Sequence, residues 1–203
     1  MAITAKDVQS LRQAAGVGMM DAKKALTETD GDIDAAITLL RERGLAKAAK
    51  RADRDASEGV IGSYLHEQGG RVVTGVLVRL ASETDFVAKS PEFVDTARDI
   101  AMHVAWAKPR WVSREDVDQA ELDAEKDVIA KQAQNEGKPE HIIPQIVEGR
   151  IAKFYQDHVL LEQTFVNAEK FEGTIEEYVQ ALAIKMGENI SISGFSRLAI
   201  GQE

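Results

Sequence analysis

Three segments at the start of the chain carry apolar residues every three or four positions, which is the spacing of one face of an α-helix. The first begins at the Thr4 and Asp7 capping pair and stops at Gly16. The second runs from about Met20 to Thr27, and the third runs from Ile33 to Gly44, whose glycine is a natural stop. We therefore predict a small three-helix bundle, whose limited core suits docking.

The pattern changes to a period of two after residue 57, which is typical of β-strands. Apolar residues recur over 60–65, Gly69-Gly70 forms a turn, and the apolar run 72–80 follows. Both faces of this second strand are apolar, so we expect it to be central and covered by helices. Alternation resumes over 190–195, which predicts a third strand that closes an antiparallel sheet.

Helical spacing fills the chain between the second and third predicted strands. Ser90-Pro91 opens a helix that ends at Pro109. Residues 113–158 follow, broken by a Gly-Lys-Pro turn at 137–139, and we expect them to fold as two antiparallel helices. A last helix is predicted over 174–186, which begins at a Thr-Glu capping pair and is terminated by Gly187.

These elements indicate the α+β class, because strands and helices do not alternate regularly. We expect an N-terminal module over residues 1–44, a linker over 45–56 and a core domain over 57–203. The core consists of a roughly three-stranded antiparallel sheet packed with helices, and it carries a coiled-coil-like arm over about 113–158. The arm is acidic, with ten acidic and four basic residues between 114 and 148.

The linker differs from its surroundings because it is basic. Lys47, Lys50, Arg51 and Arg54 lie among alanines, which predicts a helical connection. A solvated linker, a docking strip for an acidic partner surface and a phosphate-binding patch are all compatible with this composition.

Composition excludes several classes of function. The 203 residues, 44% hydrophobic and 29% charged, fit a soluble globular chain of one or two domains. Cysteine is absent, which removes disulfides and thiolate chemistry, and the net charge of −9 argues against nucleic-acid binding. No apolar run could span a bilayer, and the N-terminus lacks a signal-peptide pattern, so we expect a cytoplasmic protein that binds no membrane.

Motifs for catalysis and metal binding are missing from the sequence. None of the four histidines has the spacing of a zinc site. Gly16-Val17-Gly18 lacks the third glycine of a dinucleotide-binding loop, and Gly137-Lys138 precedes a proline rather than a serine or threonine. We therefore predict no catalytic residues, no metal site and no cofactor.

The tetrapeptide Thr84-Asp85-Phe86-Val87 is the strongest candidate for a functional site. It follows the apolar run 72–80 and precedes the helix that Ser90-Pro91 opens, so it forms a corner between a strand and a helix. We expect Phe86 to point toward a partner. Two roles are open for Asp85: a charge that acts on a partner's site, or a cap for the following helix.

An ordered set of short motifs connects these predictions. The motifs are Leu11-Arg12, Gly18-Met19-Met20-Asp21, Lys23-Lys24-Ala25-Leu26, Gly31-Asp32, Ala35-Ala36-Ile37, Glu58-Gly59-Val60-Ile61, Thr84-Asp85-Phe86-Val87-Ala88-Lys89, Ile100-Ala101-Met102-His103-Val104-Ala105, Gly137-Lys138-Pro139 and Met186-Gly187-Glu188-Asn189-Ile190. No single motif is specific, but the set covers nearly the whole chain. In this order it resembles the bacterial elongation factor Ts family.

The resemblance implies a ubiquitin-associated-like (UBA-like) N-terminal bundle and a guanine nucleotide exchange factor. The implied partner is elongation factor Tu, in its GDP-bound and nucleotide-free forms, whose magnesium and phosphate site the corner would disturb. The residues implied in partner binding are Thr84, Asp85, Phe86 and Val87 at the corner, Arg12, Met19 and Met20 in the N-terminal module, and His66 and Met186 as secondary contacts.

The chain resembles the short form of the family, because it contains one core half instead of two. That form implies a homodimer, which would be non-covalent here because the chain has no cysteine. Two other functions are compatible with parts of the sequence. The first 44 residues suit a ubiquitin-binding adaptor, and Asp85 with His66 suits a small enzyme.

Overall fold

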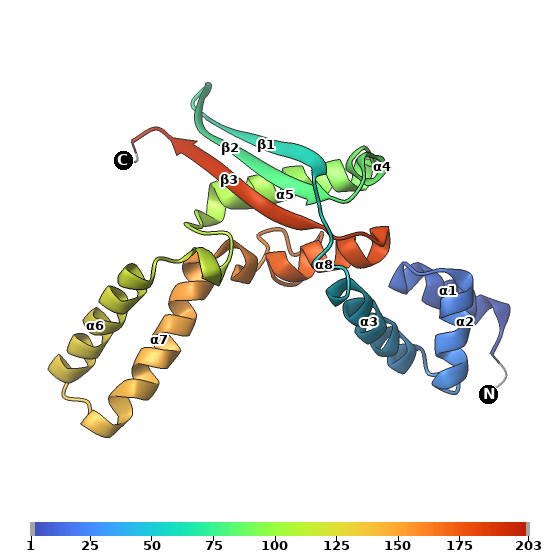
Figure 1. Cartoon of the computed structure of the whole chain (residues 1–203), viewed down its shortest axis with the longest axis horizontal. Helices are drawn as coiled ribbons and strands as arrows, with labels where there is room; N and C mark the ends of the chain where they lie inside the picture. The colour runs from blue at the N-terminus through green and yellow to red at the C-terminus, as the bar shows by residue number, and fades with distance from the viewer. Residues whose placement is uncertain (1–2, 202–203) are drawn as a thin grey trace.

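The computed structural model describes residues 3–201 and has the predicted α+β fold: an antiparallel sheet packed with helices, from which two helical parts project (Figure 1). The sheet has the strand order β1-β2-β3, so β2 is central, as predicted. The elements are α1 (Ala5–Ala15), α2 (Met19–Glu28), α3 (Ile33–Ala49), β1 (Glu58–Gln68), β2 (Arg71–Ser82), α4 (Asp85–Ala88), α5 (Pro91–Ala107), η1 (Arg114–Asp116), α6 (Gln119–Asn135), η2 (Glu140–Ile142), α7 (Ile143–His158), η3 (Leu160–Glu162), α8 (Ile175–Met186) and β3 (Ser191–Ala199).

Helices α1 to α3 form the predicted N-terminal bundle around a hydrophobic cluster of their own. Thr4 and Asp7 form a reciprocal capping box at the start of α1, and Gly16 ends that helix at a φ of 64°. Leu11 and Leu26 are completely buried in this cluster. The bundle contacts the rest of the protein through α3, which packs against α8.

The prediction that Gly44 ends the third helix is wrong, because α3 continues to Ala49. The residues after Gly44 are good helix formers, so nothing local stops the helix. Gly44 instead permits close packing: a Cβ atom there would lie 2.8 Å from Cγ2 of Ile184 in α8. Arg41, one turn earlier, pairs with Glu177 of α8 at 3.1 Å.

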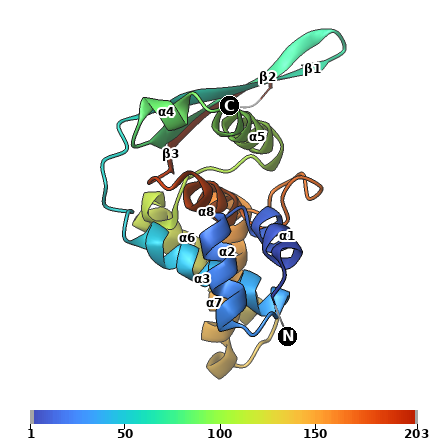
Figure 2. The same cartoon turned by 90° about the vertical axis from the view of Figure 1, so that its right-hand side faces the viewer.

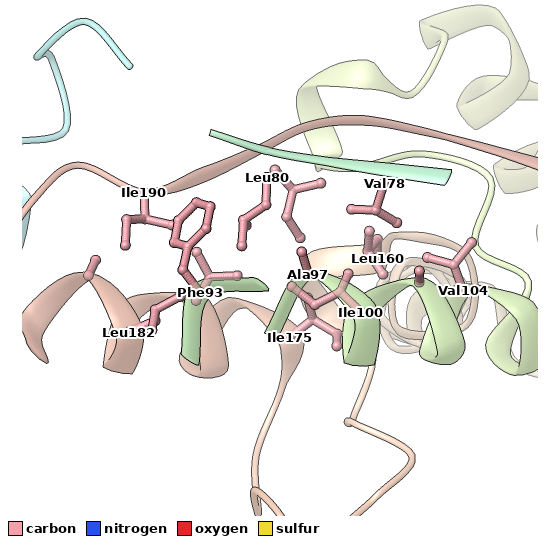
Figure 3. Close-up of a cluster of buried hydrophobic side chains, with 14 of the residues drawn as sticks. Val78, Leu80, Phe93, Ala97, Ile100, Val104, Leu160, Ile175, Leu182 and Ile190 are labelled. Atoms are coloured by element: carbon pink, nitrogen blue, oxygen red, sulfur yellow. The ribbon is translucent and has the colours of Figure 1, made fainter. Parts of the chain in front are cut away.

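The main core lies on one face of the sheet. Val78 and Leu80 of β2 point toward α5, where Phe93 and Ile100 are completely buried (Figure 3). Helix α8 completes this layer and buries Ile175. Helix α5 packs very closely on β1, because a Cβ atom on Gly62 would overlap the backbone of α5.

The opposite face of the sheet is open, so the prediction that helices cover the central strand is wrong for that face. Its register places four apolar side chains together, each more than half exposed. Apolar residues on both faces of a strand indicate burial on both sides, but no helix in the described part of the chain covers this face (Figure 1). We call these residues the open sheet face: Ile61, Leu65, Leu77 and Leu198.

Helices α6 and α7 form the predicted antiparallel arm, joined by a short turn (Figure 1). A small cluster of Leu122, Ile129 and Ile151 packs between the two helices. In the orthogonal view, the arm and the N-terminal bundle both extend from α8 on the side away from the sheet (Figure 2). They occupy opposite ends of the molecule in Figure 1, and α4 lies at the end that carries the bundle.

Candidate protein-binding site

The corner after β2 is built by two helix caps in quick succession. Thr84 has an extended backbone, and its Oγ1 accepts a hydrogen bond from the Val87 N–H at 3.4 Å, which starts α4. This helix lasts one turn. Ser90 then accepts a bond from the Phe93 N–H at 3.4 Å, and Pro91 follows at the first position of α5. Each cap redirects the chain, so α4 projects at the end of the sheet (Figure 1).

Within this corner, adjacent side chains have opposite environments. Phe86 is 83% exposed, although a phenyl ring is among the most apolar of side chains. Val87 is only 5% exposed and belongs to the main hydrophobic core, together with Ala88. The buried pair therefore anchors the short helix, and the anchored helix presents the ring of Phe86 to solvent.

Asp85 pairs with a neighbour on the same turn. Its carboxylate lies 2.5 Å from Nζ of Lys89, and both side chains are largely exposed. The hydrogen bond from Lys89 holds the pKa of Asp85 below its usual range, and the same bond raises the pKa of Lys89. Asp85 is not a helix cap, because Thr84 caps α4 and Ser90 caps α5.

A carboxylate from a distant part of the sequence also holds the corner. Oε2 of Glu188 accepts hydrogen bonds from the backbone N–H groups of Glu83 and Thr84, both at 3.1 Å. Its Oε1 accepts a bond from the Thr84 hydroxyl at 2.6 Å. The sequence interpretation gave Glu188 no role beyond its place in a matching motif, because nothing local shows that the turn after α8 meets the end of β2.

The candidate contacts of the N-terminal module lie on its surface. Met20 is 78% exposed and Met19 is 47% exposed at the start of α2, and Arg12 is exposed in the last turn of α1. Exposed methionines adapt their shape to a partner, because their side chains are unbranched and flexible. Met19 and Met20 on α2 and Phe86 on α4 are therefore exposed apolar side chains, and both helices lie at the same end of the molecule in Figure 1.

The two secondary candidates lie at different distances from the corner. Met186 is half-buried in the last turn of α8, two residues before Glu188. His66 lies near the hairpin turn, where its ring contacts Trp106 with 5.5 Å between ring centroids. His66 lies eight positions along β1 from Glu58, which pairs with the end of β2, and this corresponds to about 27 Å. His66 and Asp85 therefore cannot act as one acid–base pair.

Two kinds of structure associated with other functions are not found in residues 3–201. No group of three or more His, Cys, Asp or Glu residues there could hold a metal ion. No helix in that range is long and apolar enough to cross a membrane. Three of the candidate residues, Met19, Met20 and Phe86, are exposed apolar side chains in the first turn of their helices.

Comparison with known proteins decides the family. The model of the family "Elongation factor TS" matches residues 2–202. The chain is 51% identical over 202 residues to elongation factor Ts of Alkaliphilus oremlandii (strain OhILAs), covering 100% of this chain and 91% of that protein. It is 47% identical over 200 residues to elongation factor Ts of Thermosipho melanesiensis, covering 98% of this chain and 100% of that protein. The chain belongs to the elongation factor Ts family.

Membership in the elongation factor Ts family implies a nucleotide-exchange role in translation elongation. An exchange factor of this kind is not a catalytic enzyme in the usual sense. Its physical requirement is a surface that binds a second protein in one conformation better than in another. An exposed aromatic residue that is held by caps and by a buried neighbour fits that requirement.

Proposed function

We propose that this chain is a guanine nucleotide exchange factor for elongation factor Tu. It binds the GDP-bound GTPase, and the corner of Thr84, Asp85, Phe86 and Val87 disturbs the site that holds magnesium and phosphate. GDP then leaves, and GTP binds to the nucleotide-free partner. The observation that carries this proposal is the 83% exposure of Phe86 on a corner anchored by Val87, in a chain of the elongation factor Ts family. We place the activity in the cytoplasm, where translation elongation takes place.

Energetics require more than the ring of Phe86. Burying one phenylalanine contributes about 1.5–3 kcal/mol. Weakening GDP binding by about 10⁴-fold takes roughly 5.5 kcal/mol of differential binding. The N-terminal module supplies the additional contacts in our proposal, through Arg12, Met19 and Met20. In this proposal Phe86 acts as a wedge, the module acts as an anchor, and Met186, in the last turn of α8, adds a secondary contact.

A second copy of the chain is the partner that we propose for the open sheet face. Ile61, Leu65, Leu77 and Leu198 lie on one face of the sheet, with small residues opposite Leu65, Leu77 and Leu198 and with Arg79 opposite Ile61. Packing two such faces together would bury them as in a β-sandwich, about 10 Å apart. Such a homodimer would be non-covalent, because the chain has no cysteine. The corner and the N-terminal module lie outside this face and would stay accessible.

Thermodynamic linkage supplies the test of the exchange function. If the chain weakens GDP binding by some factor, GDP must weaken binding of the chain by the same factor. Calorimetric titration of the chain into nucleotide-free and into GDP-loaded elongation factor Tu measures that factor directly. We expect much tighter binding to the nucleotide-free partner. Equal affinities for the two forms would overturn the proposal, because a ligand with equal affinity for two states shifts neither.

A further inference from the structure

The turn between α8 and β3 is joined to the corner by hydrogen bonds between segments that are far apart in the sequence. Glu188 is half-buried, and it accepts three hydrogen bonds from Glu83 and Thr84, about 105 residues away in sequence. A carboxylate bonded to two adjacent backbone N–H groups fixes the direction of the chain at that point. Thr84, the second of these two residues, is the last residue before α4 begins.

The Thr84 hydroxyl links Glu188 to the helix that carries Phe86. A hydroxyl has one proton to donate and lone pairs that accept. Its proton goes to Oε1 of Glu188 at 2.6 Å, so a lone pair is directed to the Val87 N–H, the bond that caps α4. Glu188 therefore orients the cap, and the cap orients the single helical turn on which Phe86 stands.

The neighbouring residue, Asn189, connects the same corner to the linker. Its backbone N–H donates to Oε1 of Glu83 at 2.6 Å, and this bond holds the pKa of Glu83 below its usual range. Its side-chain amide donates to the carbonyl oxygens of Ala52 and Arg54, at 3.1 Å and 2.8 Å. The guanidinium of Arg54 forms an ion pair with Glu83, with 3.4 Å between Nη1 and Oε2. Two adjacent residues of this turn, Glu188 and Asn189, thus hold both the corner and the end of the segment that leads from the N-terminal bundle.

We propose that Glu188 is a positioning residue for nucleotide exchange, which holds the corner so that Phe86 enters the partner already oriented, and that Asn189 fixes the linker relative to it. This inference rests on the proposed exchange function. A corner that is ordered before binding avoids the cost of ordering a mobile segment in the complex. Loss of the Glu188 bonds therefore acts on the step in which Phe86 is inserted, whereas docking of the N-terminal module is unaffected.

The test compares Glu188→Ala with Glu188→Gln. Alanine removes all three bonds. Glutamine retains an oxygen that accepts from the two backbone N–H groups, but its NH₂ group cannot accept the Thr84 proton. The matched control is Glu148→Ala, at an exposed position of α7 in the arm. Hydrogen–deuterium exchange of the peptide spanning 83–90, together with the melting curve, measures the corner in the free protein.

We expect Glu188→Ala to accelerate deuterium exchange at the corner without changing the cooperative melting of the core. At saturating factor it lowers the rate of GDP release from elongation factor Tu by roughly tenfold to a hundredfold, the loss typical of an ångström-scale misplacement. The factor concentration at half-maximal rate changes much less. Glu188→Gln recovers only part of the rate, because it keeps an acceptor for the two backbone N–H groups but lacks the bond that orients the Thr84 cap, and Glu148→Ala matches wild type.

Asn189→Ala tests the role of Asn189 in fixing the linker separately from the role of Glu188 at the corner. It keeps the backbone N–H that bonds to Glu83, but it removes the side-chain bonds to Ala52 and Arg54. We expect it to raise the half-maximal concentration severalfold and to leave the maximal rate near wild type, because only the anchor becomes less well placed.

Each outcome has a distinct meaning. Unchanged deuterium exchange in Glu188→Ala would show that Glu188 does not hold the corner. A loosened corner with a wild-type release rate would show that its order is irrelevant to exchange, and either result overturns the inference. If the wild-type chain itself fails to release GDP, the proposed function is refuted, while the deuterium-exchange comparison still decides whether Glu188 holds the corner.

Discussion

Two adjacent residues of the corner should respond to truncation in opposite ways. Phe86→Ala removes a ring that is 83% exposed, so the free energy of unfolding should change by no more than about 0.5 kcal/mol, as for other surface substitutions. Val87→Ala removes two methyl groups from a side chain that is 5% exposed. At about 0.8 kcal/mol per buried carbon, plus the cost of a cavity, this should destabilise the fold by roughly 1.5–3 kcal/mol.

The two substitutions should affect nucleotide exchange in the reverse order, with Phe86→Ala causing the larger loss. If Phe86 is buried only in the complex, its truncation loses about 1.5–3 kcal/mol of binding, which corresponds to roughly a 10- to 150-fold slower GDP release. Val87→Ala should keep most of the activity at temperatures where it is folded, because its side chain faces the core. Urea unfolding followed by circular dichroism gives the stability, and stopped-flow release of fluorescent GDP from elongation factor Tu gives the activity.

These opposite effects on stability and on exchange form a strict test, because a substitution that damaged the whole protein would lower both the free energy of unfolding and the rate of GDP release. Val128→Ala is the matched control for Phe86→Ala: an exposed apolar residue on α6, at the other end of the molecule. It should change neither quantity. The reasoning would be refuted if Phe86→Ala were the more destabilising of the two substitutions, or if it released GDP at the wild-type rate.

Three further predictions concern the rest of the molecule. His103 is buried beside Phe165 and Gln163, and this burial lowers its pKa below the ordinary value of 6.5. As the pH falls below about 6.5, the unfolded chain therefore binds more protons at this residue than the folded chain does. The free energy of unfolding should therefore decrease with falling pH in that range, by up to about 1.4 kcal/mol per pH unit. Urea unfolding of His103→Phe should show a smaller dependence of this free energy on pH. An unchanged pH dependence would show that His103 is not its cause. Deletion of residues 1–50 removes a bundle that has its own hydrophobic cluster, so the remaining core should still melt cooperatively. The factor concentration that gives the half-maximal rate of GDP release should rise. Non-cooperative melting of the remaining core would contradict the modular interpretation. Leu77→Glu places a charge in the open sheet face, so a wild-type dimer of 22.2 kDa chains should become a monomer in sedimentation equilibrium, and a wild-type monomer would refute the dimer proposal.

Features whose causes are local could be predicted from the sequence. The capping pairs at Thr4 and Thr174 lie within one helical turn, and both form as the sequence indicates. The two glycines of the hairpin turn have φ values of 60° and 75°, which favour glycine. Periodicity placed the three strands and the long helices for the same reason, since each pattern reports on its own segment.

Features that depend on distant partners could not be predicted. A glycine that ends a helix and a glycine that admits a neighbouring helix look the same in a sequence, and Gly44 proved to be the second kind because Ile184 lies against it. An apolar face on a strand does not reveal whether a helix or another chain covers it, which is why the open sheet face was expected to be covered. The role of Glu188 depends on a meeting of segments about 105 residues apart.

The candidate site was predictable as a location but not in its orientation. The order of apolar and polar segments placed the tetrapeptide from Thr84 to Val87 at a strand-to-helix corner, where the structure has it. The sequence could not say which side chains face out. In the structure, Phe86 faces solvent and Val87 faces the core. The helix that Asp85 was considered to cap is α5, and Ser90 caps it.

Release of fluorescent GDP from pre-loaded elongation factor Tu tests the exchange function most directly. Excess unlabelled nucleotide prevents rebinding, and the chain is added in substoichiometric amounts. We predict that release becomes many times faster than the spontaneous rate, that each chain serves several partner molecules, and that Phe86→Ala loses most of this acceleration. Release at the spontaneous rate in the presence of the folded wild-type chain, even when its amount is then raised to an excess, would contradict the account.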